Sequence, residues 1–181
     1  DLESSKVLED ERFYRYGRFF SLNLGVGFTD FTGNRGTAYR QNPPSYHFSI
    51  NYFFNFTSSL NFGVEYSQHT MFVDFPVQAY SDRIIGAVET NLLRPFIAFR
   101  YYLDTRDLGT ALTYSNPYFT GRVAYWYQVN KFREDEVLQD QKGGGLGLGI
   151  GGGFEFPLII QEAFLGVEFL YNKVNLFDRF T

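Results

Sequence analysis

Cysteine is absent from this 181-residue sequence, and methionine occurs only once. The absence of cysteine leaves no thiolate for a metal site and fits an oxidising envelope compartment. No window approaches the roughly 18 consecutive apolar residues of a membrane-spanning helix, which argues against a helical membrane protein. The net charge of −4 is too weak, and of the wrong sign, to indicate nucleic-acid binding.

Aromatic residues, by contrast, are abundant. They make up 20% of the chain, with 22 Phe and 14 Tyr. The mean hydropathy of −0.23 is that of a water-soluble protein. A transmembrane β-barrel gives a similar value, because only every second residue of its strands is apolar. The length is enough for one domain, and the start at Asp1 rather than Met is what removal of a leader would leave.

The segment from Ser45 to Ser67 has the clearest pattern in the sequence. Apolar and polar residues alternate along its two arms, which is typical of strands with one apolar and one polar face. The polar residues 57–59 separate the arms and predict a β-hairpin. The apolar positions are Phe48, Ile50, Tyr52, Phe54 and Phe56 in the first arm and Leu60, Phe62, Val64 and Tyr66 in the second.

The alternation also restricts the register of this hairpin. Residues directly opposite each other must face the same side of the sheet, so paired residue numbers must have an even sum. A three-residue turn at 57–59 then fixes one register. The predicted pairs are Phe54 with Phe62, Asn51 with Glu65, His47 with His69, and Phe53 with Gly63.

Five more segments with the same alternation predict the remaining strands. They cover about residues 18–29, 94–103, 118–129, 146–156 and 163–172. Pro95 cannot donate a hydrogen bond to a ladder, so we expect a bulge there. The connections are expected to be long after the first, third and fifth strands and shorter after the second, fourth and sixth.

The residues before the first strand differ from the rest in composition. Residues 1–17 are charged and irregular, and they end in the aromatic residues Phe13, Tyr14 and Tyr16. We expect a mobile periplasmic arm with an aromatic anchor at its end. Residues 18–181 then form the β-domain.

The two faces of the predicted strands differ consistently. A soluble sandwich cannot keep a polar face of small residues inside and leave so many Phe and Tyr to water, whereas a lipid-facing barrel explains both. The residues expected to form a lumen network are Asn51, Glu65, Arg94, Arg100, Arg122, Glu155 and Glu168. The residues expected to face lipid are Leu22, Leu24, Ile50, Tyr52, Phe54, Phe62, Val64, Phe99, Val123, Leu148 and Val167.

These patterns resemble the small outer-membrane β-barrels of Gram-negative bacteria, of the outer membrane protein A, X and W type. The resemblance covers about residues 14–172 and rests on the alternation of Phe20–Phe28, the aromatic strand ends and the order of long and short connections. It implies an antiparallel transmembrane barrel of about eight strands in the outer membrane, in contact with lipid and lipopolysaccharide.

Seven strands are clear in the sequence, and the eighth is not. A turn at Lys173, followed by a short strand from Val174 to Phe180, could close the barrel. An eighth strand could instead be missing, or a partner could supply it. An edge has to be covered in some way, because unpaired backbone groups are costly in hydrocarbon.

Three motifs suggest chemistry, and each also has a structural interpretation. Gly147–Gly152 matches a dinucleotide-binding fingerprint, but glycine at alternate positions is typical of a strand that faces a narrow lumen. His47-Phe48-Ser49 resembles the His-x-Ser motif of outer-membrane lipid A deacylases, with Glu65 as the supporting acid. His47 and His69 would form a weak metal site, since a third ligand is missing.

The sequence therefore predicts a barrel with a filled lumen and no cofactor. An eight-stranded barrel has room inside only for side chains. We expect a non-enzymatic anchor or scaffold that binds an envelope partner through its N-terminal arm or its long loops. The second candidate is a channel for small solutes or apolar compounds, and the third is a lipid-modifying hydrolase.

Overall fold

The computed structural model describes residues 2–33, 36, 39, 43–73, 86–105, 114–133, 139–159 and 162–176. A helix comes first, and strands follow it. The elements are α1 (Leu2–Tyr16), β1 (Phe20–Phe28), β2 (Pro44–Phe53), β3 (Ser58–Val73), β4 (Gly86–Tyr102), β5 (Asn116–Phe132), β6 (Gln141–Ile159) and β7 (Ala163–Val174). Among the described residues, no helix is long and apolar enough to cross a membrane.

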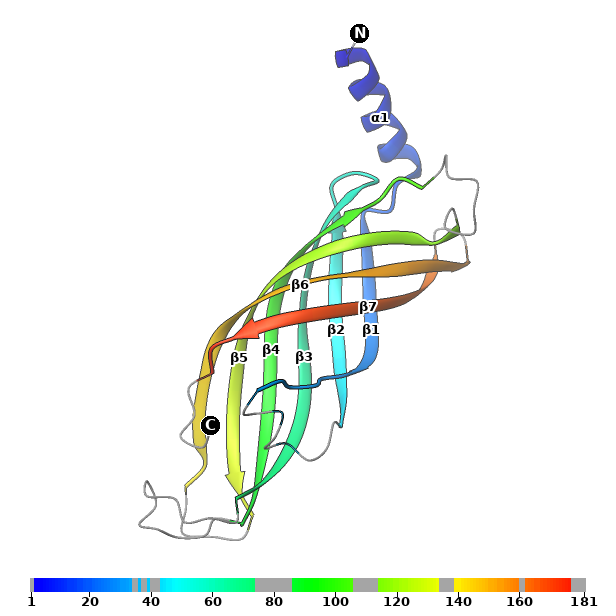
Figure 1. Cartoon of the computed structure of the whole chain (residues 1–181). Helices are drawn as coiled ribbons and strands as arrows, with labels where there is room; N and C mark the ends of the chain where they lie inside the picture. The colour runs from blue at the N-terminus through cyan, green and yellow to red at the C-terminus, as the bar shows by residue number, and fades with distance from the viewer. Residues whose placement is uncertain are drawn as a thin grey trace.

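The strands form one sheet in which every strand lies beside its neighbour in the sequence. Each neighbouring pair is antiparallel. The sheet curls into a half-barrel, and α1 projects from one end of it, beyond the turn between β2 and β3 (Figure 1). The predicted all-β antiparallel fold is confirmed, and the curled sheet is consistent with a β-barrel.

Side-chain exposure alternates along the strands, as the sequence pattern predicts. In β4 and β5, buried and exposed residues follow one another over most of their length. The exposed side chains are mostly large and apolar, whereas the buried ones include many polar and charged groups. The polar parity therefore lines the concave side of the sheet, and the apolar parity covers the convex side.

The predicted register of the β2–β3 hairpin is wrong, although the facing of its residues is right. Ile50 lies opposite Phe62, and His47 lies opposite Glu65. The turn is longer than expected because the Asn55 side chain organises it. Asn55 Oδ1 accepts hydrogen bonds from the backbone amides of Thr57 and Ser58, at 2.9 and 2.7 Å. With this side-chain turn in place, β2 ends at Phe53 and β3 begins at Ser58, both earlier than the predicted turn at 57–59 required.

The predicted bulge at Pro95 is also wrong. Pro95 lies opposite Val64 in a continuous β3–β4 ladder. On the other side, the β4–β5 ladder passes over Arg94 and Pro95 and resumes at Phe96 in the same register. The sheet therefore accommodates Pro95, which has no backbone N–H, without the extra residue that a bulge would insert. The irregularity of the sheet lies instead in β6, between Pro157 and Ile159.

The N-terminal segment is a helix and not an irregular arm. Its aromatic anchor is Phe13, which is buried together with Phe53, Tyr102 and Tyr118. The Phe13 ring makes edge-to-face contacts with Phe19 and Phe56, with 5.1 Å between ring centroids in both cases. These contacts fix the last turn of α1 to the barrel end that carries the β2–β3 turn.

Two further expectations about connections need correction. The connection after β4, residues 103–115, is longer than the connection after β5, residues 133–140, so the predicted alternation fails there. Lys173 and Val174 belong to β7, and therefore no turn begins at Lys173. Residues 177–180 of the predicted closing strand lie outside the described residues.

Candidate functional site

The concave side of the sheet holds a continuous series of charged side chains. The series is Arg18, Glu155, Arg100, Glu168, Arg122, Glu65 and Arg94, with positive and negative groups in alternation. Arg18 precedes β1, and the other members come from β3 to β7. Side chains from opposite parts of the sheet thus meet across the lumen.

Arg100 and Arg122 each contact two carboxylates and so hold the middle of this series together. Arg100 Nη2 donates to Glu168 at 2.7 Å and lies 3.7 Å from Glu155 through Nη1. Arg122 donates to Glu65 at 2.6 Å and to Glu168 at 3.2 Å. Because Glu168 belongs to β7 whereas its partners belong to β4 and β5, these ion pairs cross the barrel interior.

The two ends of the series are Arg18 and Arg94. Arg18 donates a hydrogen bond to Glu155 at 2.6 Å. Arg94 donates to the Thr29 hydroxyl at 2.9 Å, and its Nε lies 3.6 Å from Glu65. The guanidinium groups also stack on aromatic rings, for example Arg122 on Phe96 with 3.8 Å from Cζ to the ring centroid. Such stacking favours a charged group that has left water.

Sequence reasoning identified most members of this network and missed some. Asn51 is fully buried and donates to Ser21, while its Oδ1 lies 3.5 Å from Arg100. The missed members include Tyr102, which donates to Glu155, and Tyr118, which donates to Glu168. Both tyrosines share the parity of the buried arginines, and that parity was the available signal. Arg18 gave the opposite signal, because it lay within the predicted strand on the parity of the apolar residues, whereas in the structure it precedes β1.

His47, Ser49 and Glu65 come together in an arrangement that resembles a catalytic triad. His47 Nε2 lies 2.9 Å from Ser49 Oγ, and His47 Nδ1 lies 3.2 Å from Glu65. However, Ser49 is fully buried, and its Oγ also accepts hydrogen bonds from Asn23 and Asn61. A nucleophile must reach its substrate, and this hydroxyl is enclosed by side chains.

The glycine-rich segment of the fingerprint lies within β6, and the strand β7 follows β6. Its glycines make room for large rings from β5. A Cβ at Gly147 would lie 2.6 Å from Trp126 Nε1, and one at Gly153 would lie 2.6 Å from the Tyr118 hydroxyl. Gly63 has the same relation to Phe96, and not to Phe53 as the predicted register required. These glycines therefore permit a narrow interior.

The two histidines do not lie opposite each other. His69 pairs with Thr90 of β4 and packs against Phe31 and Tyr39, whereas His47 stacks on Phe96. Among the described residues, no group of three His, Asp or Glu side chains lies close enough to hold a metal ion.

The convex side of the sheet carries the residues expected to face lipid. Leu22, Leu24, Ile50, Tyr52, Phe54, Phe62, Phe99, Val123, Leu148 and Val167 are exposed on it. Val64 is half-buried on the same face, and Phe54 belongs to the β2–β3 turn and not to a strand. This face is broadly apolar, with Leu24 as much as 84% exposed.

On the convex side, residues that pair across neighbouring strands form rows. The apolar rows make up a band, and this band ends where polar rows begin. One middle row runs Phe62, Ile97, Val123 and Leu148 and ends at the exposed Lys173 of β7, and a later row runs Tyr66, Leu93, Tyr127 and Gly144. Directly beyond them the rows become polar. The next two rows are Gln68, Asn91, Val129 and Lys142, and then Thr70, Glu89 and Lys131.

The band boundary is fixed by hydrogen bonds as well. Tyr66, at the last apolar row, donates its hydroxyl to Asn91 in the first polar row, at 2.6 Å. In the following row Glu89 is bound by Arg133. Along β3 the outward apolar side chains run from Leu60 to Tyr66, and in the row of Ser58 the band continues with Tyr101 and Phe119.

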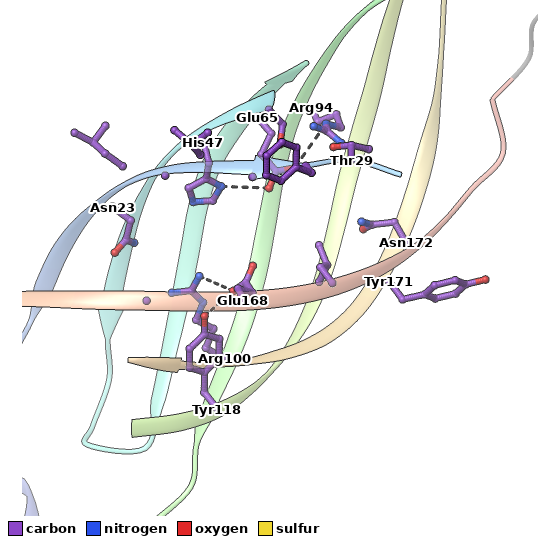
Figure 2. A pocket seen from close by; sticks show the side chains of 18 of the residues that line it. Asn23, Thr29, His47, Glu65, Arg94, Arg100, Tyr118, Glu168, Tyr171 and Asn172 are labelled. Atoms are coloured by element: carbon purple, nitrogen blue, oxygen red, sulfur yellow. Dashed lines mark hydrogen bonds and ion pairs between the residues drawn. The ribbon is translucent and has the colours of Figure 1, made fainter. Parts of the chain in front are cut away.

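A cavity of about 980 Å³ lies on the concave side between β1 and β7. Figure 2 shows that His47, Glu65 and Arg94 gather in one part of it and Arg100, Glu168 and Tyr118 in another. Tyr171 points away from these groups (Figure 2). The ion-paired side chains therefore form the floor of the cavity, and the edges of β1 and β7 form its rim.

No protein-family profile, curated protein or solved structure matches this chain.

Proposed function

We propose that this protein is a non-enzymatic β-barrel of the bacterial outer membrane, which serves as an anchor or scaffold in the cell envelope. The observation that carries the proposal is the convex apolar band with its polar edge. Exposing an apolar surface of this size to water is unfavourable, whereas its contact with the hydrocarbon of a bilayer is favourable.

The interior supports a structural role better than transport. The ion pairs of Arg100 and Arg122 with Glu168 extend across the lumen, and aromatic rings fill the space around them. Charges in a low-dielectric interior persist only when they are paired and hydrogen-bonded, and here they form one connected series. Such a layer of ion-paired side chains would stiffen the barrel and obstruct passage, and the cavity of about 980 Å³ lies beside it, between β1 and β7.

The partner of such a scaffold would bind outside the membrane band. We propose that α1 presents that surface, because it projects from the barrel end and Phe13 holds its base in place (Figure 1). Exposed Val7, Leu8 and Tyr14 lie on α1 beside charged residues. An envelope protein is the proposed partner of α1, whereas outer-membrane lipid and lipopolysaccharide are the proposed contacts of the convex apolar band.

A channel is the second candidate, and the cavity beside β1 and β7 is the observation in its favour. Conductance across planar lipid bilayers separates the two functions. A plugged barrel gives no steady conductance as wild type, and Arg100→Gln or Arg122→Gln raises conductance by loosening the plug. A channel conducts as wild type, and the same substitutions change its ion selectivity.

The decisive test of the membrane assignment is insertion. The urea-unfolded chain should fold into phospholipid vesicles, float with them in a density gradient and migrate differently on gels before and after boiling. A chain that stays in solution as a folded, monodisperse particle would contradict the proposal.

A further inference from the structure

Arg94, at one end of the ion-paired series, has unpaired hydrogen-bond donors. Arg122 donates to Glu65 at 2.6 Å, whereas Arg94 Nε lies 3.6 Å from the same carboxylate, which is too far for a hydrogen bond. Arg94 Nη1 donates to Thr29, but Nε and Nη2 have no hydrogen-bond partner in the part of the chain that the structure describes. Because the Arg94 side chain is only 3% exposed, these unpaired donors are unfavourable until an acceptor binds them.

The charges of the series do not balance either. Each of its three glutamates is shared between two of its four arginines, so four positive and three negative groups leave a formal charge of +1. Arg100 and Arg122 each contact two carboxylates, whereas Arg94 shares one distant carboxylate with Arg122. The excess positive charge therefore lies at Arg94. Three further charged residues line the cavity, but they are exposed and outside the series: Asp30, Glu162 and Lys173.

An apolar surface lies directly beside this cation. The Arg94 Cζ atom is 4.7 Å from the centroid of the Trp126 ring. Trp126 belongs to the buried cluster against which Phe31, Val174 and Leu176 pack. All of these side chains line the cavity of about 980 Å³. A buried cation and an apolar wall thus border the same space.

Two parts of the chain bring these groups together. The segment after β1 crosses the concave side of the sheet (Figure 1), where Thr29 accepts the hydrogen bond from Arg94 of β4. The Phe31 ring of the same segment lies 6.2 Å from the ring of Trp126 in β5. From β7, the Asn172 side chain points into the same cavity (Figure 2). The site is built from inward-facing side chains and uses no backbone group of the strand edges.

We propose that this corner of the lumen binds an organic anion, namely a carboxylate on an apolar body. Nε–H and Nη2–H lie on one edge of the Arg94 guanidinium, and such an edge binds both oxygens of a carboxylate. Phe31, Trp126 and Leu176 would contact the apolar body. One carboxylate also cancels the excess charge of the series. Apolar walls with a few placed polar groups are typical of ligand sites, whose volumes of about 300–1,000 Å³ include that of this cavity.

Octanoate is a suitable probe, and octanamide is its uncharged counterpart. Folded protein in a nonionic detergent is titrated with each probe by calorimetry. Trp126 is the only tryptophan of the chain, so its fluorescence reports whether the probe reaches the site. We expect saturable binding of octanoate with a change in Trp126 emission. Octanamide should bind about tenfold more weakly, because hydrogen bonds to charged groups are stronger than those between neutral groups.

Two substitutions test the two halves of the site. Arg94→Gln should weaken octanoate binding about tenfold and leave octanamide binding unchanged, because only the charge-assisted bonds are lost. Phe31→Ala should weaken the binding of both probes, because it removes part of the apolar wall. Arg18→Gln is the matched control, since Arg18 lies at the other end of the series and binds Glu155. It should leave the binding of octanoate unchanged. Different migration of unboiled and boiled samples on gels verifies that each variant is folded.

Several results would overturn the inference. They are the absence of saturable octanoate binding, equal affinity for octanamide, and unchanged octanoate affinity in Arg94→Gln. An equal loss in Arg18→Gln would place the anion elsewhere in the lumen and overturn it as well. If Arg94→Gln does not fold, unchanged affinity in Phe31→Ala has the same meaning. The titrations are made in detergent and concern ligand binding alone, so their failure is distinct from a failure of vesicle insertion or of the conductance test.

Discussion

Arg122 links two carboxylates that come from distant strands, and its side chain is only 3% exposed. Replacement by Gln leaves Glu65 and Glu168 without their shared cation. We expect Arg122→Gln to lower the free energy of unfolding by about 3–5 kcal/mol, the range for breaking a buried ion pair. Urea unfolding in detergent micelles measures this change. The matched control is Arg133→Gln, since the Arg133 side chain is 65% exposed where it binds Glu89; its expected cost is about 0–1 kcal/mol. Equal losses of unfolding free energy for the two variants would mean that the lumen is hydrated and that the ion-paired series contributes little to stability.

Ser49 distinguishes a hydrogen-bond network from a catalytic site. Ser49→Ala removes the partner of His47, Asn23 and Asn61, and we expect the free energy of unfolding to fall by about 1–3 kcal/mol. Ser21→Ala is the milder comparison, because Ser21 is half-buried and accepts a bond from Asn51. We expect no ester hydrolysis by wild type or by either variant. Hydrolysis of an acyl-ester substrate by wild type that Ser49→Ala abolishes would establish the enzyme instead.

At the scale of elements, residue parity was readable from the sequence and register was not. Even sums of paired residue numbers are satisfied both by Phe54 opposite Phe62 and by Ile50 opposite Phe62, so alternation cannot choose between them. The choice depends on Asn55, whose side chain caps two amides of the turn. The same limit applies to α1, where a weakly amphipathic, charged segment gave no periodic signal, and packing of Phe13 fixes its position.

Docking of α1 gives a prediction at this scale. Phe13→Ala removes two edge-to-face contacts, each of about 0.5–1.5 kcal/mol beyond the buried area. We expect α1 to detach, so that trypsin cleaves after Arg12 and Arg15 faster, by about tenfold for 1.4 kcal/mol. The strand signal in circular dichroism should stay unchanged. Leu8→Ala is the control, because the Leu8 side chain on α1 is 66% exposed. Loss of strand signal in Phe13→Ala would mean that α1 is required for the sheet itself.

At the scale of the whole molecule, the fold class was predictable because period-two alternation extends through most of the chain. The lumen residues followed from the same parity, including Glu155 and Glu168, which lie far from Arg100 in the sequence and adjacent to it in space. Which carboxylate meets which arginine could not be predicted, since it depends on sheet curvature and register. The polar edge of the convex band likewise became visible only when cross-strand rows were aligned.

That band leads to a prediction about depth. Ile97 lies in a middle apolar row between Phe62 and Val123, whereas Gln68 lies in the first polar row beyond Tyr66. In a bilayer, we expect Ile97→Arg to cost about 2–4 kcal/mol and Gln68→Arg about 0–1 kcal/mol, because the cost of a cation falls from the midplane to the interface. Unfolding by urea from phospholipid vesicles measures both. In a water-soluble particle Ile97 is 53% exposed, and its replacement by Arg would cost almost nothing. Equal, small costs for the two variants would therefore contradict the membrane assignment, and a cost that declines from row to row would also locate the bilayer along the strands.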